Sequence, residues 1–394
     1  MQNAEDILLS LLSAAEKRDY SGYSKFDALN SPLLRRASLN NKWLRLLYTQ
    51  VVKEFPLNIR PLFGVKPSRN PKGIALFARA YFFLFQKTQD RGYLKRGELL
   101  LQWLLRNPSP GQDNLCWGYN FPWQSPIFFV DMFEPNAVVT AFVGEALIHA
   151  YRITGNETYL TAARSVAEFM VKDLPVLYDS EKERAVAYVL RRVGAVVLNN
   201  QVLTGAFLIK IWKHTGERDL RDVAIRQIKF TVGNRTPYDA WYYTYPAERS
   251  MIHHDNYHTG GILDGLLEYY EETGDDRYLD IYWKGLSYYE RNLFEEDGAP
   301  RWMNDKKYPY DVHGSAQGII TFKKAARHKK TYEWQAVKVA DWAIRNLYRQ
   351  KTQDFSYRKG RLIKWNYSLM RWCNAWMARA LAELTYEEEK SEDL

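Results

Sequence analysis

The segment Thr154-Gly-Asn-Glu-Thr-Tyr-Leu160 carries a turn that recurs along the chain and decides the fold. A glycine at a helix end adopts the left-handed backbone conformation at little cost, and an Asn or Asp after it can cap the next helix. The Tyr-Leu pair then starts a new apolar stripe. Related turns occur at Thr88-Gln-Asp-Arg-Gly-Tyr-Leu94, Thr215-Gly-Glu-Arg-Asp-Leu220 and Thr273-Gly-Asp-Asp-Arg-Tyr-Leu279, with a degenerate copy at His328-Lys-Lys-Thr-Tyr-Glu-Trp334.

The spacing of these turns predicts a closed ring of helical hairpins. The copies are separated by roughly 58 to 66 residues, which suits a two-helix unit with a long connection. Segments beside the turns, such as 138–151 and 162–170, repeat apolar or small residues every three or four positions. We therefore expect an all-α fold, an (α/α)6 toroid, with five hairpins between about residues 72 and 348. A helix at 366–386 would pair with one at 33–54 as the sixth hairpin.

Such a ring makes residues 1–394 a single domain, with residues 1–32 as an N-terminal extension. The short turns would lie on one rim of the ring and the long loops on the other, where there is room for a binding site. Within the predicted long loop at about 175–198, the segment 183–197 places Ala185, Ala187 and Val189 in alternation. This pattern is compatible with one short β-hairpin in a rim loop.

The composition narrows the classes of protein. The chain has a formal net charge of +9, but its basic residues form no dense stripe and no nucleic-acid module is evident, so we expect no nucleic-acid partner. Its two cysteines are too few for a disulfide framework. The N-terminus is a poor secretory signal, and no apolar stretch approaches the length of a membrane span. We expect a cytoplasmic protein without membrane insertion, whose basic excess suits an anionic small substrate.

The unusual residues gather in the predicted long loops, each of which leads into the first helix of a hairpin. Side chains at those helix starts should converge on one mouth, where helix N-termini also favour anions. The candidates for catalysis are Asp131, Glu134, Asp255, His258, Asp311 and His313. The candidates for binding a saccharide are Trp117, Tyr119, Trp123, Asn256, Tyr257, Gln317, Arg371, Trp372 and Trp376.

Several of these residues also have a purely structural interpretation. An acidic residue such as Asp255 can cap the helix that follows it. His254 and His258 have a metal-ligand spacing on a helix, but no third ligand is evident, so we expect no bound metal and no other cofactor. Arg371 either stacks on Trp372 as a structural residue or clamps a carboxylate or phosphate.

Two kinds of chemistry fit such a pocket. Hydrolysis of a glycosidic bond uses two carboxylates, one protonated and one ionised. The candidates for this pair are Asp131 or Glu134, Asp255 and Asp311. Epimerisation or elimination uses an acid and a base, often histidines, with an arginine on the substrate carboxylate. The candidates for those roles are His258, His313 and Arg371.

Our first interpretation is a carbohydrate-active enzyme that hydrolyses an acidic, uronic-acid-containing saccharide. Two alternatives stay open on the residues alone. One is a uronate or acylamino-sugar epimerase or lyase with histidine general acid/base groups. The other is a non-catalytic glycan-binding toroid.

Several segments carry a resemblance to known proteins. They are Asn58-Ile-Arg-Pro-Leu62, Asn70-Pro-Lys-Gly73, Trp117-Gly-Tyr119 with Trp123, Asp255-Asn-Tyr-His-Thr-Gly260, Asp311-Val-His313 with Gln317, and Arg371-Trp372 with Trp376. With the hairpin repeat, the chain resembles the six-hairpin glycosidase-like toroids, which include unsaturated glucuronyl hydrolases, N-acylglucosamine 2-epimerases and glucuronyl C5-epimerases. The segments are most similar to a little-characterised bacterial and archaeal group linked to surface polysaccharides. The resemblance implies a saccharide-related role without fixing the reaction.

Overall fold

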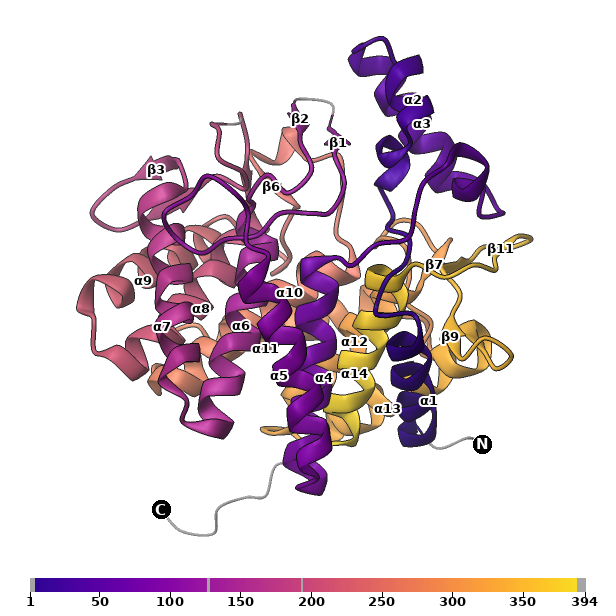
Figure 1. The fold of residues 1–394 in the computed structure, drawn as a ribbon. Coiled ribbons are helices and arrows are strands. Elements are labelled where there is room, and N and C mark those ends of the chain that lie inside the picture. Colours follow the sequence, from indigo (N-terminus) through magenta and orange to yellow (C-terminus); the bar gives the residue numbers. More distant parts are fainter. Residues whose placement is uncertain (1–3, 126–127, 193, 388–394) are drawn as a thin grey trace.

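Six helical hairpins form a closed ring in the computed structural model, which describes residues 4–125, 128–192 and 194–387 (Figure 1). The inner helices are α4 (Pro71–Thr88), α6 (Ala137–Thr154), α8 (Leu198–Thr215), α10 (Asn256–Thr273), α12 (Val312–Ala326) and α14 (Trp376–Thr385). The outer helices are α5 (Arg91–Arg106), α7 (Glu157–Glu168), α9 (Arg218–Gly233), α11 (Leu279–Leu293), α13 (Thr331–Leu347) and α1 (Ala4–Lys17). Because α14 packs against both α4 and α12, the ring is closed, which confirms the predicted all-α toroid.

The recurrent turn has the local structure that its residues predict. Gly155, Gly216 and Gly274 end α6, α8 and α10 in the left-handed conformation, with φ between 66° and 74°. The preceding threonine closes the turn, as where the Thr154 hydroxyl accepts a hydrogen bond from the backbone N–H of Asn156 at 3.2 Å. The Asn156 side chain then caps α7 by accepting the N–H of Thr158 at 3.0 Å. Local chemistry therefore explains why each inner helix turns directly into an outer one.

Inner and outer helices differ in how much of their surface they bury. The inner helix α4 buries 13 of its 18 residues, whereas the outer helix α5 buries four of its 16. An inner helix contacts two inner neighbours and its outer partner, so most of its circumference is covered. An outer helix needs only one apolar stripe, which leaves its other side to water.

The predicted closure of the ring by the segment 33–54 is wrong. The N-terminal helix α1 packs against α14 instead, and Ile7, Leu8, Leu11 and Leu12 of α1 are buried there. These residues form a continuous apolar stripe at helical spacing, so residues 4–17 are part of the ring rather than only an extension before it. The C-terminal helix itself begins with a π-helical turn, η5 (Met370–Ala375), that runs into α14.

The segment that was expected to close the ring lies above the rim with the long loops. It contains α2 (Pro32–Ala37) and α3 (Lys42–Glu54), which stand away from the other helices (Figure 1). Its own core is small and consists of Ala28, Leu34 and Val52 with a few partly buried neighbours. Most of the apolar surface of the segment is not packed against the ring, and α1 takes the place of the sixth outer helix.

Short strands pair within the long loops and, for β5 with β6 and β7 with β10, between two of them. They are β1 (Trp123–Gln124) with β2 (Phe129–Val130), β3 (Val176–Asp179) with β4 (Arg184–Val186), β5 (Val196–Val197) with β6 (Thr244–Tyr245), β8 (Tyr348–Arg349) with β9 (Asp354–Phe355), and a sheet of order β11 (Lys364–Trp365), β10 (Arg358–Lys359), β7 (Tyr310–Asp311). A rim-loop hairpin exists, but its first strand is β3, outside the expected segment 183–197. Val196 and Val197 pair with the next long loop, so the predicted position needs correction.

Among the described helices, none combines the length and the apolar composition that crossing a bilayer requires.

The role of α1 in the ring predicts an asymmetry between two adjacent leucines. Leu8 is fully buried against the ring, whereas Leu9 is 37% exposed. We expect Leu8→Ala to lower the free energy of unfolding by about 2–5 kcal/mol, because it removes buried methyl groups and leaves a cavity. Leu9→Ala is the matched control and should change it by less than about 1 kcal/mol. Urea unfolding measures both, and equal effects would contradict the assignment of α1 to the ring.

Candidate active site

A cavity of about 290 Å³ opens on the long-loop rim and extends down between the inner helices. Nine of the residues selected from the sequence line it: Tyr119, Trp123, Tyr257, His258, His313, Gln317, Arg371, Trp372 and Trp376. They come from positions more than 250 residues apart and meet because every inner helix starts at the same rim. The expected convergence of His258 and His313 is confirmed, since both rings contact the Tyr257 ring, at 4.5 and 4.7 Å between centroids.

Six candidates lie outside the lining of the cavity: Trp117, Asp131, Glu134, Asp255, Asn256 and Asp311. Trp117 is fully buried in the core, where its indole N–H donates to the carbonyl oxygen of Leu104 at 3.0 Å, so its prediction as a sugar platform is wrong. The Asn256 side chain is likewise internal and donates to the carbonyl oxygen of Leu293.

The acidic candidates of the first long loop, Asp131 and Glu134, also lie away from the cavity. Glu134 pairs with Arg191 and accepts the backbone N–H of Asp131 at 3.1 Å, which ties down the loop. The Asp131 side chain points to solvent, and neither carboxylate reaches the cavity. A catalytic role for this pair is therefore not supported by its position.

His258 and Asp255 form a hydrogen-bonded pair at the first turn of α10. One carboxylate oxygen of Asp255 caps the helix by accepting the backbone N–H of His258 at 2.9 Å. The other accepts the Nδ1–H of the His258 ring at 2.8 Å. Asp255 is buried, whereas the His258 side chain is 20% exposed to the cavity. Because Asp255 holds the proton on Nδ1, the Nε2 atom of His258 is left as the proton acceptor.

His313 sits in an aromatic box at the start of α12. Its ring stacks on Tyr257 with 6° between the planes and lies 4.4 and 4.3 Å from the Trp372 and Trp376 rings. Neither ring nitrogen has a hydrogen-bond partner in the described part of the chain. Burial, followed by the positive charges of Lys72 and Arg371, holds the pKa of His313 well below its usual value. His313 is therefore neutral at physiological pH, with one N–H to donate to a ligand.

Three cationic residues surround this box. Lys25 lies with its Nζ atom 3.7 Å from the Trp372 ring centroid and 3.8 Å from the Asp311 carboxylate. Lys72 rests on the Phe142 ring at 3.8 Å, and Arg371 faces the Tyr119 ring at 5.0 Å. Within the residues that the structure covers, no carboxylate pairs with Lys72 or Arg371. A buried cation without a counter-ion is electrostatically costly, and no carboxylate offsets that cost for Lys72 or Arg371 in the described part of the chain.

The titration behaviour of the lysines follows from this excess of positive charge. Burial lowers the pKa of Lys25 to about 7, although Asp311 acts in the opposite direction. Burial and the neighbouring Arg371 hold the pKa of Lys72 well below its usual value. An anion bound between these side chains would favour their charged forms.

Asp311 connects several of the groups around the cavity. One of its carboxylate oxygens accepts the backbone N–H of His313 at 2.9 Å and the indole N–H of Trp372 at 2.7 Å. It therefore caps α12 and fixes a wall of the aromatic box. With the other oxygen facing Lys25, Asp311 is a positioning residue.

The sequence reasoning missed both lysines. Lys72 falls in the segment Asn70-Pro-Lys-Gly73 that contributed to the resemblance, so a signal was present. Lys25 lies in the connection between α1 and α2 and gave no signal, because only the folded chain brings it under Trp372.

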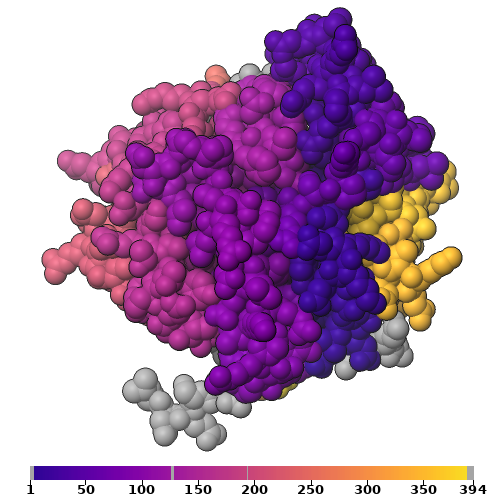
Figure 2. All heavy atoms as spheres, in the orientation of Figure 1, coloured from indigo at the N-terminus to yellow at the C-terminus, as the bar shows by residue number. Residues whose placement is uncertain are grey.

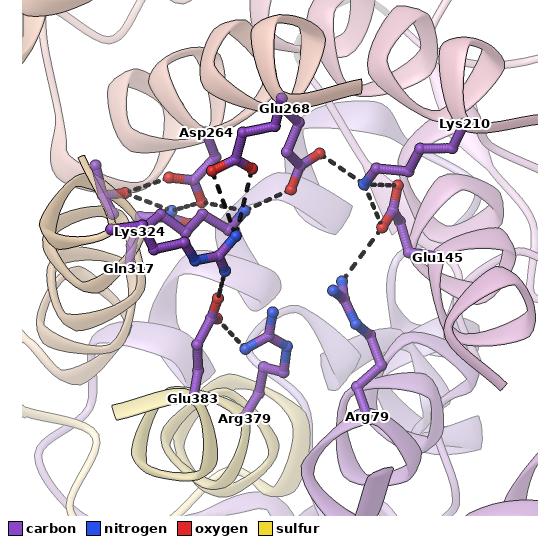
Figure 3. Close-up of polar contacts among 12 residues, drawn as sticks. Arg79, Glu145, Lys210, Asp264, Glu268, Gln317, Lys324, Arg379 and Glu383 are labelled. Atoms are coloured by element: carbon purple, nitrogen blue, oxygen red, sulfur yellow. Dashed lines mark hydrogen bonds and ion pairs between the residues drawn. The ribbon is translucent and has the colours of Figure 1, made fainter. Parts of the chain in front are cut away.

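Deeper in the ring, the inner helices supply a belt of paired charges (Figure 3). This charged belt comprises Arg79 on α4, Glu145 on α6, Lys210 on α8, Asp264 and Glu268 on α10, Lys324 on α12, and Arg379 and Glu383 on α14. Lys210 bridges Glu145 at 2.7 Å and Glu268 at 2.8 Å. Lys324 bridges Glu268 and Asp264. The belt differs from the upper cavity because each of its charges has a partner of opposite sign.

The pKa values of the two carboxyl groups that α10 contributes to the belt are shifted in opposite directions. Burial raises the pKa of Asp264, although Lys324 opposes the effect. Burial acts on Glu268 in the same sense, but Lys210 and Lys324 outweigh it and hold the pKa of Glu268 well below its usual value. Asp264 also accepts hydrogen bonds from Gln317 at 2.9 Å and from Thr321 at 2.8 Å.

The histidine pair with metal-ligand spacing is not arranged around a common point. His254 donates its Nδ1–H to the carbonyl oxygen of Trp241 at 2.8 Å and accepts from the Tyr238 hydroxyl at 3.0 Å. His258 uses Nδ1 on Asp255. Over the described ranges, no group of three or more His, Cys, Asp or Glu side chains is placed to hold a metal ion.

Comparisons with known proteins agree with this architecture. Residues 141–285 match the family model of the beta-L-arabinofuranosidase GH127 catalytic domain. A sugar epimerase from a ruminal bacterium aligns with a TM-score of 0.64 at 16% identity, covering 81% of this chain and 89% of that one. The chain has the six-hairpin glycosidase-like fold.

Other six-hairpin toroids give the same result. A Listeria innocua protein aligns with a TM-score of 0.63 at 13% identity over 97% of this chain and 96% of its own. The GH76 alpha-mannanase of Bacteroides thetaiotaomicron aligns with a TM-score of 0.62 at 16% identity over 81% and 85%. No curated protein matches the sequence. Both hydrolases and epimerases use six-hairpin toroids, so the reaction has to be argued from the site.

The environment of His313 predicts an unusual titration. Burial and the neighbouring cations both disfavour a proton on its ring, so we expect His313 to titrate well below the ordinary histidine pKa of roughly 6.5. Its contribution to stability is therefore full above that ordinary pKa and is lost as the pH falls below it, because only the unfolded chain then takes up the proton. Long-range 1H–15N spectra of histidine-labelled protein, assigned with His313→Gln, measure this. A midpoint near 6.5 would contradict the structure of the box.

Proposed function

We propose that this protein is a carbohydrate-active enzyme that acts on an acidic saccharide and uses His258 as its proton-transferring group. The hydrogen bond from the His258 ring to the buried Asp255 carboxylate carries the proposal. A carboxylate in this position orients the ring and stabilises the imidazolium that forms when Nε2 accepts a proton. His258 is also the partly exposed member of the pair, on the wall of the cavity.

The cationic upper cavity supports an acidic substrate. Arg371 and Lys72 lack carboxylate partners among the described residues, while Lys25 has only Asp311 at 3.8 Å. An arginine binds a carboxylate through two parallel hydrogen bonds, and a lysine beside it adds a point charge. A uronic-acid carboxylate between these residues would supply the negative charge that the upper cavity lacks.

The aromatic lining supports a sugar as the body of the substrate. Trp123, Trp372 and Trp376 line the cavity with their rings, next to Tyr119 and Tyr257. Aromatic faces bury the apolar face of a sugar ring, and the hydroxyl and indole N–H groups remain free to bond its polar edge. The indole N–H groups of Trp123 and Trp376 are buried without a partner in the described structure, so they are available to substrate hydroxyls.

Proton abstraction next to a carboxylate or carbonyl is the chemistry that these groups favour. His258 would remove the proton through Nε2, and Arg371 with Lys72 would stabilise the negative charge that develops on the oxygen atoms. The neutral His313 would donate its N–H to the same developing charge, since a neutral imidazole is a competent hydrogen-bond donor. Return of a proton from water to the opposite face gives an epimer. Departure of a neighbouring substituent as an alcohol, which takes up the proton held by His258, gives an unsaturated sugar.

His258→Gln tests the proposed base. We expect kcat to fall by about two to four orders of magnitude with little change in KM, because a general base acts mainly in the transition state. The assay incubates the protein in D2O with a panel of uronic-acid oligosaccharides and follows deuterium entering carbon-bound positions by mass. His253→Gln is the matched control, since His253 is exposed outside the cavity and bonds only Asp305.

Two results would reject this role of His258. One is a variant His258→Gln that turns over as fast as the wild type. The other is a wild-type reaction that releases reducing sugar carrying oxygen from 18O-labelled water while no deuterium enters carbon. The second result would indicate hydrolysis.

Hydrolysis is the second candidate because of the charged belt and the family match. The matched region, 141–285, contains Asp264 and Glu268, which lie one helical turn apart on α10 and both line the cavity. Their pKa values are shifted in opposite directions, as a glycosidase requires of its acid and its ionised carboxylate. Against this, Glu268 is occupied by two lysines, which lowers its availability to a substrate.

Arg371→Ala tests the anionic substrate separately from the reaction. Loss of a charge-assisted hydrogen-bonding residue should weaken binding of an acidic oligosaccharide by about tenfold to a hundredfold. Arg361→Ala, in an exposed part of the preceding loop, should leave binding unchanged. Calorimetric titration measures both, and thermal melts check that each variant is folded. Equal binding by Arg371→Ala, or tighter binding of neutral than of acidic glycans, would reject the acidic substrate.

A further inference from the structure

The α2–α3 segment, residues 32–66, exposes an unusual amount of apolar surface. Eight of the 20 large apolar side chains that are exposed in the described structure lie in its 35 residues. They are Leu33, Leu39, Trp43, Leu47, Val51, Phe55, Leu57 and Leu62. Trp43, Leu47 and Val51 follow each other at intervals of four on α3, which gives one continuous stripe. The opposite side of α3 carries Thr49 and Val52, the two buried residues of that helix.

The same segment is strongly basic. It contains seven basic residues, Arg35, Arg36, Lys42, Arg45, Lys53, Arg60 and Lys66, and one acidic residue, Glu54. Arg60 is used internally, in an ion pair with Asp27 at 2.6 Å. Arg35, Arg36, Lys42 and Lys66 are exposed. An exposed apolar stripe with basic residues around it is typical of helices that lie in a membrane interface.

The shape of the segment decides against a groove for a peptide. Figure 2 shows the segment, blue-violet at the upper right, as a knob that projects from the body of the molecule. A second copy of the chain is also a poor occupant. A twofold interface would set the basic residues of one copy against the same residues of the other. A membrane surface with negatively charged headgroups and an apolar interior matches both the basic residues and the exposed apolar stripe of the segment.

We propose that the α2–α3 segment binds the surface of a membrane that contains anionic lipids. Trp43, Leu47 and Val51 enter the headgroup region, while Arg35, Arg36 and Lys42 face the lipid phosphates. Binding is peripheral and does not involve a membrane-spanning helix. This inference goes beyond the proposed reaction and does not depend on it.

The α2–α3 segment lies next to the mouth of the cavity, so a membrane bound by the segment would also be near the site. Lys25 and Phe26, just before the segment, line the cavity. Arg45 of α3 lies 4.2 Å from the ring of Phe129 on β2, and α3 also contacts β1, which carries Trp123. A membrane bound by the segment would therefore lie close to the opening through which a saccharide enters.

Vesicle co-sedimentation of the full chain tests the proposal. The vesicles consist of phosphatidylcholine alone, or of phosphatidylcholine with an equal part of phosphatidylglycerol. One variant combines Trp43→Ser, Leu47→Ser and Val51→Ser, and a second combines Arg35→Gln, Arg36→Gln and Lys42→Gln. The matched control combines Trp334→Ser and Leu362→Ser, which are 67% and 93% exposed on other parts of the ring. Thermal melts establish that the variants are folded.

We expect binding to the anionic vesicles that weakens by about tenfold or more in either triple variant and at high salt, but not in the control. Failure of the wild type to bind anionic vesicles would overturn the proposal. Equal binding to both vesicle types, or equal loss in the control, would overturn it as well. A concentration-dependent dimer that the Trp43 triple variant abolishes, without vesicle binding, would assign the surface to a second copy.

Discussion

The pairing of opposite charges across the axis of the ring is the interaction on which the rest of the structure depends. Six inner helices that surround one axis bring charged side chains into a space with little water, and an unpaired charge there costs on the order of several kcal/mol. In the charged belt, ion pairs between neighbouring inner helices offset this cost. Lys210 of α8 joins Glu145 of α6 to Glu268 of α10, and Lys324 of α12 continues the chain of contacts. Each bridge therefore also fixes the position of one inner helix relative to the next.

Above the belt, toward the rim with the long loops, the cationic side chains Lys72 and Arg371 are no longer paired with carboxylates of the described residues, and the candidate site begins there. Asp264 lies six residues beyond His258 on α10, which is about 9 Å further along the helix axis. At the level of His258, Lys72 and Arg371 have no carboxylate partner in the described structure, and His313 has no hydrogen-bond partner. A binding protein gains affinity from groups that are already desolvated and fixed, because the ligand supplies the missing partner. The incomplete upper level is stable because the complete lower level and the apolar core hold the helices together.

The contrast between the two histidines separates the chemistries that this fold supports. Asp255 gives His258 a hydrogen-bonded carboxylate partner, whereas burial and the neighbouring cations hold the pKa of His313 well below its usual value. Similar rings on the same scaffold therefore suit different tasks, one to accept a proton and one to donate a hydrogen bond. The carboxyl groups that would serve hydrolysis lie lower, within the belt, and their lysine partners compete with a substrate. The position of a group along an inner helix thus decides what it can do.

The sequence by itself determined the features that depend on neighbours in the chain. The Thr-Gly turns, the helical periodicity and the possible cap at Asp255 are local, so they predicted the hairpins and their common rim. Nine of the fifteen selected residues line the cavity because every long loop ends at that rim. Only the tertiary structure decided which segment closes the ring, because α1 and the segment 33–54 both contain an amphipathic helix, and only packing shows that α1 is the one against α14. The tertiary structure also decided which charged residues lie at the cavity. Lys25 reaches it through its contact with Trp372, whereas Glu134 is held away from it by an ion pair with Arg191, and both contacts join residues far apart in sequence. Such pairings follow from packing in three dimensions, and no local pattern encodes them.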